Sequence, residues 1–145
     1  MSLVVLDEQI APKVATSLAA LGYAVEHVSM IQGLGTGTTD KDILKFCGVS
    51  ERALITLDYK MYTRPQQREL IKAHKVGVFF IRSGSKDVLL PPDIVELILH
   101  HWDAIDDIVR NARRPFMKRL QTGRRMMEYE TRRERRKQKK GRKRK

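Results

Sequence analysis

Three aspartates stand at the ends or starts of predicted elements in a pattern that can build a metal site. Asp7 ends the apolar run at residues 3–6, and Asp58 ends the run at 53–57. Asp40 stands near the start of a predicted helix that lies between the two runs. Ligands of an open parallel sheet bind outside the carboxyl ends of the strands. We therefore expect the three carboxylates to converge at one edge, where a cation would relieve their mutual repulsion.

Hard divalent cations suit such a group of acids. Mg²⁺ and Mn²⁺ take oxygen ligands, often a few carboxylates together with water and substrate phosphate. A bound ion of this kind can activate water and stabilise charge on a phosphoryl centre. We predict Asp7, Asp40 and Asp58 as catalytic metal ligands, with Asp42 or Glu8 as candidates for a further carboxylate. Taken singly, each acid could equally be a solvated loop residue or an acid that favours a helix dipole.

The elements that would position these acids alternate between strand and helix patterns. Apolar runs of strand length occur at residues 3–6, 24–28, 53–57 and 76–81. Apolar residues at helical spacing indicate helices at residues 10–21, where Gly22 ends the helix, and beyond Pro91-Pro92. Thr39 and Asp42 fit a capping box that opens a helix over 39–47, and Pro65 can occupy the first turn of a helix over 65–74. Continuous apolar strands that alternate with helices favour a mostly parallel sheet covered on both faces. The predicted fold class is α/β, a three-layer α/β/α sandwich.

Charge divides the chain into two parts. The 145 residues carry a formal net charge of +12. Residues 110–145 hold 18 Lys and Arg against 3 acids, whereas residues 1–109 hold 11 against 14. We predict an α/β domain over residues 1–112 and a basic C-terminal arm over 113–145, whose distal part has too few apolar side chains to fold alone. The asymmetry indicates a polyanionic partner such as nucleic acid, with a solubilising tail as the plainer alternative.

Basic residues in two regions are the candidates for phosphate contacts. Lys60, Arg64 and Arg82 stand near predicted strand ends. The arm supplies the remaining candidates, which are Arg132, Arg133, Arg135, Arg136, Lys139 and Lys140.

Other features exclude some classes of protein. Cys47 is the only cysteine and lies in an apolar run, so we expect a small buried residue rather than a disulfide or a zinc ligand. No apolar stretch reaches the roughly 18 residues that cross a bilayer, and no signal peptide is visible. We therefore expect a soluble cytoplasmic protein that has no membrane partner. The glycines at 33, 35 and 37 do not match a phosphate-binding fingerprint and indicate a loop.

The same acids also carry a family resemblance. The segments 3–7, 39–42 and 54–58 follow the order of the motifs in PIN-like ribonucleases. The chain is most similar to the VapC-type proteins of bacterial toxin–antitoxin systems. In that group a threonine–x–aspartate strand end, here Thr56 to Asp58, is followed by a basic residue and an Arg-Pro helix start, here Lys60 and Arg64-Pro65. Including the similar segments 76–81 and 114–116, the resemblance spans residues 3 to 125.

This resemblance implies an endoribonuclease dependent on Mg²⁺ or Mn²⁺. It implies Asp7, Asp40 and Asp58 as the acids of the metal site and RNA as the substrate. It also implies the toxin of a toxin–antitoxin pair, with a cognate antitoxin as a partner and a homodimer as a possible assembly. The chain departs from the group in one respect. Many relatives carry a second acid two residues after the third-strand aspartate, where this chain has Lys60.

Two alternatives stay open. Lys60 in place of that acid favours a non-catalytic RNA- or ribosome-binding protein with the same fold. The acid pair Asp7-Glu8 and the strand-end Asp58 also suit a receiver-type phosphoacceptor domain. A receiver needs a fifth strand followed by a lysine, whereas the sequence after residue 81 predicts only one long helix and the arm.

Overall fold

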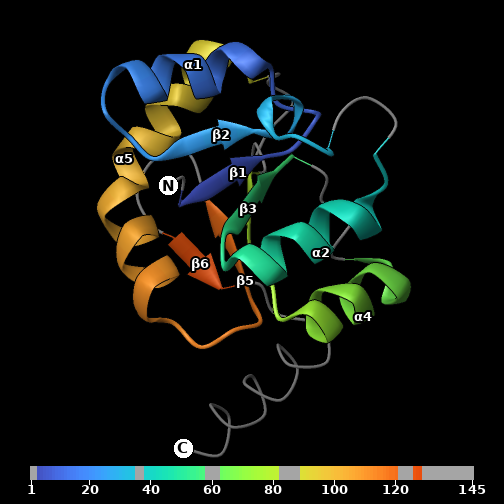
Figure 1. Cartoon of the computed structure of the whole chain (residues 1–145). Coiled ribbons are helices and arrows are strands. Elements are labelled where there is room, and N and C mark those ends of the chain that lie inside the picture. Colours follow the sequence, from blue (N-terminus) through green and yellow to red (C-terminus); the bar gives the residue numbers. More distant parts are fainter. Residues whose placement is uncertain (1–2, 35–37, 58–62, 82–88, 121–125, 129–145) are drawn as a thin grey trace, which may run out of the picture.

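The computed structural model describes residues 3–34, 38–57, 63–81, 89–120 and 126–128. The strands within these ranges are β1 (Val4–Leu6), β2 (Val25–His27), β3 (Ala53–Thr56), β4 (Gly77–Ile81), β5 (Phe116–Leu120) and β6 (Met126–Glu128). The α-helices are α1 (Pro12–Ala20), α2 (Asp40–Ser50), α4 (Pro65–His74) and α5 (Pro91–Asn111). A short 3-10 helix, η1 (Val28–Met30), follows β2 (Figure 1).

The strands form one sheet in the order β2-β1-β3-β4-β5-β6. The first five run parallel, and β6 pairs antiparallel with β5. The chain goes from β1 to the outer strand β2 and then returns to the other side of β1 to form β3. The direction of winding therefore reverses between β1 and β3, which is the topological switch point where doubly wound sheets bind ligands.

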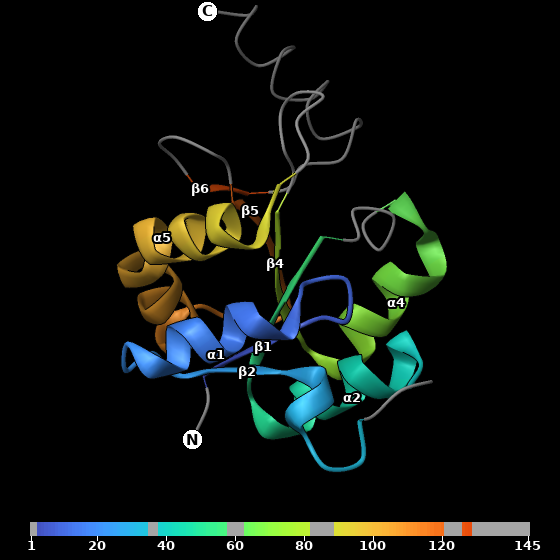
Figure 2. The ribbon, with the colours of Figure 1, turned by 90° about the horizontal axis from the view of Figure 1, so that it is seen from above.

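Helices cover both faces of the sheet. α1 and α5 lie on one side, and α2 and α4 lie on the other (Figure 2). The side chains of β1 alternate accordingly: Val4 and Leu6 pack with α1 and α5, whereas Val5 packs with α2 and α4. All three are fully buried, which accounts for an apolar run without polar alternation. The predicted three-layer α/β/α sandwich is confirmed.

The folded part extends beyond residue 112, where we expected the domain to end. β5 lies at residues 116–120 and continues the parallel sheet, so a fifth strand exists that the sequence interpretation missed. Phe116 and Leu120 are buried, and the Phe116 ring packs edge-on against Phe79 at 5.3 Å between centroids. Lys118 and Arg119 stand between these two residues, so the composition of the segment is similar to that of the basic arm. Our expectation of only one helix and an arm after residue 81 is therefore wrong.

Some helix ends lie where the sequence predicts them, and others differ by a few residues. Gly22 ends the turn after α1 with a φ of +92°, a conformation that favours glycine. α1 is shorter than predicted, so Leu21 lies past its end and is 62% exposed. α2 runs to Ser50 rather than to Cys47. Pro91 and its neighbour form the first turn of α5 instead of preceding it. None of the helices in the described part of the chain is long and apolar enough to cross a membrane.

The two helices of one layer meet closely at their C-terminal ends. Gly48 of α2 lies against the backbone of His74 in α4, where a Cβ atom would overlap the carbonyl oxygen of His74. Because that oxygen belongs to the backbone, the overlap could be relieved only by moving a helix. Glycine is therefore required at this contact, and it sets the spacing of α2 and α4.

We predict that Gly48→Ala lowers the free energy of unfolding by about 1–3 kcal/mol, as overpacking does in a dense core. Chemical denaturation would measure the loss. The neighbouring Val49→Ala is the control, because Val49 is exposed on the same helix and its truncation should change stability by less than about 0.5 kcal/mol. Equal stability of Gly48→Ala and the parent protein would show that the helices separate at little cost.

Candidate metal and catalytic site

Asp7 lies at the switch point of the sheet, directly after β1. Its backbone N–H donates to the carbonyl oxygen of Ile55 at 3.0 Å, which extends the pairing of β1 with β3 by one residue. The residue is only 5% exposed. Parallel pairing thus carries Asp7 to the carboxyl edge of the sheet and holds it there.

Two neutral donors hold the Asp7 carboxylate. The backbone N–H of Glu8 donates to Oδ1 at 2.8 Å, and the hydroxyl of Thr56 at the end of β3 donates to Oδ2 at 2.8 Å. No ion pair is formed by Asp7 within the described residues. Each carboxylate oxygen has a second lone pair that can accept a further ligand. A buried acid that is oriented but not neutralised is suited to receive a cation.

The turn that follows Asp7 is held by a buried histidine. The N–H of Ile10 donates to the carbonyl oxygen of Asp7 at 3.0 Å, and Nε2 of His27 contacts the carbonyl oxygen of Ile10 at 2.7 Å. The N–H of Ser29 donates to Nδ1 of His27 at 3.1 Å, so Nδ1 acts as an acceptor and Nε2 as the donor. His27 therefore positions the Asp7 turn, a role that the sequence did not indicate because Ile10 lies 17 residues away along the chain.

Asp40 is the first residue of α2, where the partial positive charge of the helix N-terminus favours a carboxylate. Nε2 of Gln67, in the first turn of α4, donates to Oδ2 of Asp40 at 2.9 Å. The other polar atom of the Gln67 amide, Oε1, is buried and has no hydrogen-bond partner in the described structure. Buried polar atoms without a partner are rare in folded proteins. Gln67 thus offers an unused oxygen beside Asp40, which the sequence analysis missed.

The other predicted residues of the described part have plainer surroundings. Asp42 is exposed, and its carboxylate accepts from the Thr39 hydroxyl at 2.8 Å while its N–H donates back to that hydroxyl at 3.3 Å. This is the predicted helix cap, so Asp42 stabilises the start of α2. Glu8 is exposed in the turn after β1, and Arg64 is exposed at the N-cap of α4.

Several predicted residues lie outside the described residues: Asp58, Lys60, Arg82, Arg132, Arg133, Arg135, Arg136, Lys139 and Lys140. Within the described ranges, no three His, Cys, Asp or Glu side chains lie close enough together to hold one metal ion. The predicted convergence of Asp7, Asp40 and Asp58 thus stays a prediction, because one of its three members is not among the residues described.

Cys47 belongs to α2 and lies in the core between that helix and the sheet. Burial raises the pKa of its thiol to about 12; the Asp7 carboxylate adds to the rise, and the guanidinium groups of Arg52 and Arg114 offset only part of it. The thiol therefore stays protonated at neutral pH and is neither a nucleophile nor a metal ligand. The prediction of a small buried residue is confirmed.

Residues 2–83 match the family described as a PIN like domain. This segment is more than half of the chain and runs from β1 to β4, with every described acid of the candidate site inside it. The chain belongs to the PIN-like domain family. Comparisons with curated proteins and with solved structures gave no match.

Membership of the PIN-like family gives the chain a nuclease-type fold and narrows the alternatives. The presence of β5 removes the argument from strand number against a receiver, since the order β2-β1-β3-β4-β5 also occurs in doubly wound receiver-like sheets. The family match, rather than the number of strands, now distinguishes a PIN-like domain from a receiver domain. It supports the resemblance at the level of the PIN-like domain and does not reach the VapC-type group.

We predict that Thr56→Val lowers the free energy of unfolding by about 1–3 kcal/mol, because it leaves a buried carboxylate oxygen without its donor. Thr56→Ser should retain most of the stability. A double-mutant cycle with Asp7→Ala, followed by chemical denaturation, isolates the hydrogen bond from other contacts of Thr56. Strictly additive losses in that cycle would mean that the two side chains do not interact.

Proposed function

We propose that this PIN-like protein is a metal-dependent endoribonuclease that hydrolyses RNA phosphodiester bonds at the carboxyl edge of its sheet. The observation that carries the proposal is the Asp7 carboxylate, buried at the switch point and held by two neutral donors. Both of its donors are neutral and it forms no ion pair with the described residues, so we propose that a bound metal ion compensates its charge.

The donor atoms near the two described acids fit Mg²⁺ or Mn²⁺. Asp7 and Asp40 offer carboxylate oxygens, and Gln67 offers a buried amide oxygen without a hydrogen-bond partner. These are hard oxygen donors of the kind both ions take. We propose Asp7, Asp40 and Asp58 as the ligands. When bound, the ion would activate water and stabilise charge on the phosphoryl group.

The chain's own residues would hold and orient the RNA. Thr56 and the turn held by His27 keep Asp7 in place while substrate binds. Arg64 is exposed at the start of α4, and we propose it with Lys60 and Arg82 as contacts for RNA phosphate. The role of a toxin, a cognate antitoxin and a homodimer are proposed on the VapC-type resemblance alone.

A second candidate is a non-catalytic RNA-binding protein that kept the fold. Lys60 stands where many relatives carry an acid, and it would disfavour a second cation. Titration with Mn²⁺ followed by calorimetry separates the two functions, since only the nuclease needs a divalent ion bound at Asp7.

We predict that Asp7→Asn lowers RNA cleavage by more than about 100-fold, because loss of a metal ligand should exceed the 10- to 100-fold effects of the residues that support ligands. The amide keeps the shape and one acceptor but lacks the charge that a cation needs. Cleavage of a fluorescent RNA in Mg²⁺ or Mn²⁺ would be measured. Asp103→Asn makes the same chemical change on the exposed face of α5 and should cleave as the parent does.

The free energy of unfolding of Asp7→Asn completes that test. A variant that keeps the parent's stability and loses cleavage assigns Asp7 to the chemistry. Cleavage at the parental rate would refute the proposed role of Asp7, and failure of the variant to fold would assign it to the structure instead.

We also predict that Gln67→Leu weakens Mn²⁺ binding by about 10-fold, the lower end of the effects seen for residues that support metal ligands. The substitution removes both the donor to Asp40 and the unpartnered oxygen. Gln66→Leu is a matched control, because Gln66 is exposed and adjacent in the same helix turn. Calorimetric titration of the free protein measures the affinity without turnover. Equal losses in the two variants would show that Gln67 has no special place at the site.

A further inference from the structure

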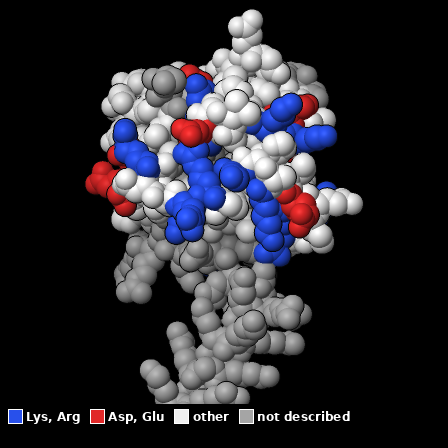
Figure 3. All heavy atoms as spheres, turned by 60° about the horizontal axis from the view of Figure 1, so that its bottom comes forward, with Lys and Arg blue, Asp and Glu red and all other residues white. Residues whose placement is uncertain are grey.

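Basic residues lie in the connections that lead into the sheet at its amino-terminal edge, opposite the acids. The connections that lead into β3, β4 and β5 are residues 51–52, 75–76 and 112–115. Together they hold four cationic residues and one acid, which are Arg52, Lys75, Arg113, Arg114 and Glu51. Figure 3 shows Lys and Arg side chains gathered on one face of the molecule, with fewer Asp and Glu among them. That view brings forward the bottom of Figure 1, where the chain passes from α5 to β5.

Backbone contacts hold these connections side by side. The N–H of Phe116 donates to the carbonyl oxygen of Val76 at 3.3 Å, so the start of β5 lies next to Lys75. Nη2 of Arg114 donates to the carbonyl oxygen of Glu51 at 2.7 Å, which joins the entry of β5 to that of β3. The close contact of Gly48 with His74 joins the ends of α2 and α4. The basic residues therefore form one surface, here called the amino-edge surface.

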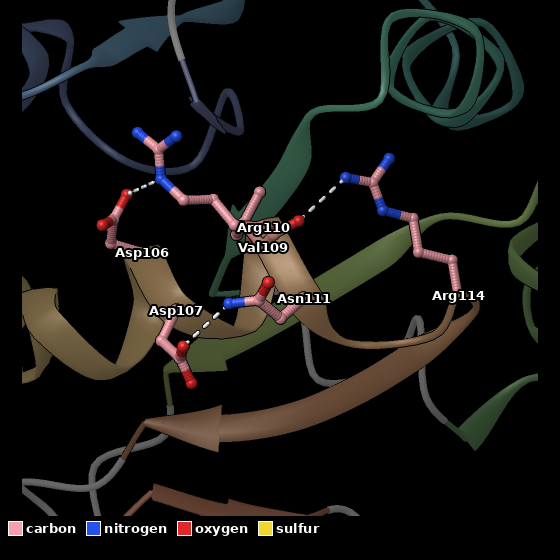
Figure 4. A network of polar contacts seen from close by, with 6 residues as sticks. All are labelled: Asp106, Asp107, Val109, Arg110, Asn111 and Arg114. Carbon is pink, nitrogen blue, oxygen red and sulfur yellow. Dashed lines mark hydrogen bonds and ion pairs between the residues drawn. The ribbon is translucent and has the colours of Figure 1, made fainter.

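Part of this charge is already compensated. Arg52 forms an ion pair with Glu26 at 3.3 Å, and Arg110 at the end of α5 pairs with Asp106 at 2.8 Å (Figure 4). Asp107 accepts a hydrogen bond from the side-chain amide of Asn111 at 2.9 Å, so its partner here is neutral and not one of the basic side chains. Of the basic residues in the connections, Lys75, Arg113 and Arg114 form no ion pair with a carboxylate of the described residues.

The three differ in how freely they can meet a ligand. The side chains of Lys75 and Arg113 are exposed and make no hydrogen bond or ion pair in the described structure. Arg114 is half-buried, and its Nη2 donates to the carbonyl oxygens of Glu51 and Val109, the second of which is drawn in Figure 4. Those acceptors are neutral, so its charge remains. An Arg fixed in this way keeps its other donors in a set direction and suits a phosphate oxygen.

The sequence that follows β6 is also strongly basic. β6 runs antiparallel to β5 and pairs Met126 with Leu120 and Glu128 with Lys118. Residues 129–145 contain 11 Lys and Arg against 2 Glu.

We propose that the amino-edge surface, centred on Lys75, Arg113 and Arg114, is a second RNA-backbone binding site that anchors substrate away from the cleavage edge. The choice of RNA rests on the proposed function. β4, with its five residues, spans about 17 Å, so an RNA long enough to pass around the domain can contact both edges. Phosphate contacts of this kind add affinity without sequence preference.

The test measures RNA affinity at several salt concentrations with EDTA present, so that no cleavage occurs. The RNA is a single strand longer than the roughly 4–16 nucleotides of one single-strand site, so that it can contact both edges. The variants are Lys75→Gln, Arg113→Gln and the double variant. Lys45→Gln is the matched control, because Lys45 is exposed on α2 and lies outside the connections. Arg114 is left unchanged because it also holds the backbone together.

For this RNA, each lost phosphate contact should reduce the slope of log affinity against log salt by about 0.7, and affinity at 0.1 M salt by about fivefold. The double variant should therefore bind about 10- to 25-fold more weakly. Lys45→Gln should show the parent's affinity. Because no turnover is involved, this result stands even where the protein cleaves no RNA.

Parental affinity and slope in the double variant would overturn the proposal. So would an equal loss with Lys45→Gln, which would show only the effect of net charge. Anionic phosphatidylserine vesicles are the last arm. Weaker vesicle binding by the double variant, with RNA binding intact, would assign the surface to membrane lipids and reject RNA.

Discussion

The parallel pairing of β1 with β3 is the constraint on which the candidate site depends. It continues past the strand ends through the N–H of Asp7 and the carbonyl of Ile55, and it brings the Thr56 hydroxyl within 2.8 Å of the Asp7 carboxylate. Because these strands are neighbours in space and 49 residues apart at that contact, any slip in their register would separate donor from acceptor. The apolar cores on both faces fix the register, so packing of the layers is what places the acid.

The same parallel sheet separates charge along its strands. Acids follow β1 and begin α2 at the carboxyl edge, whereas bases precede β3, β4 and β5 at the amino edge. The five residues of β4 set the edges about 17 Å apart, roughly twice the Debye length of about 8 Å at physiological salt. A cation can thus bind at one edge with little repulsion from the other. An anion can likewise approach the amino edge with little opposition from the acids.

The sequence predicted those parts of the structure that depend on neighbours along the chain. β1, β3 and β4 are continuous apolar runs, and Gly22 and Thr39 mark helix ends through local backbone chemistry. The sequence did not predict β5 because Lys118 and Arg119 interrupt its apolar residues. Its position in the sheet is set by pairing with β4, which is distant in the sequence. The roles of Gln67 and His27 were not predicted from the sequence for a related reason. Their hydrogen bonds reach across 27 and 17 residues, and no periodic pattern reports such contacts.

Asp40 and Asp42 show how geometry, rather than residue type, decides which partner an acid of the first helical turn meets. Both stand in the first turn of α2 and both gain from the helix dipole. Asp42 lies three residues after Thr39, so its carboxylate reaches back to the capping hydroxyl and closes the helix end. Asp40 is one residue from that cap, and its carboxylate accepts a hydrogen bond from the amide of Gln67 in α4. That contact leaves the amide oxygen of Gln67 buried and without a hydrogen-bond partner in the described structure, whereas the cap involves no side chain of a second helix.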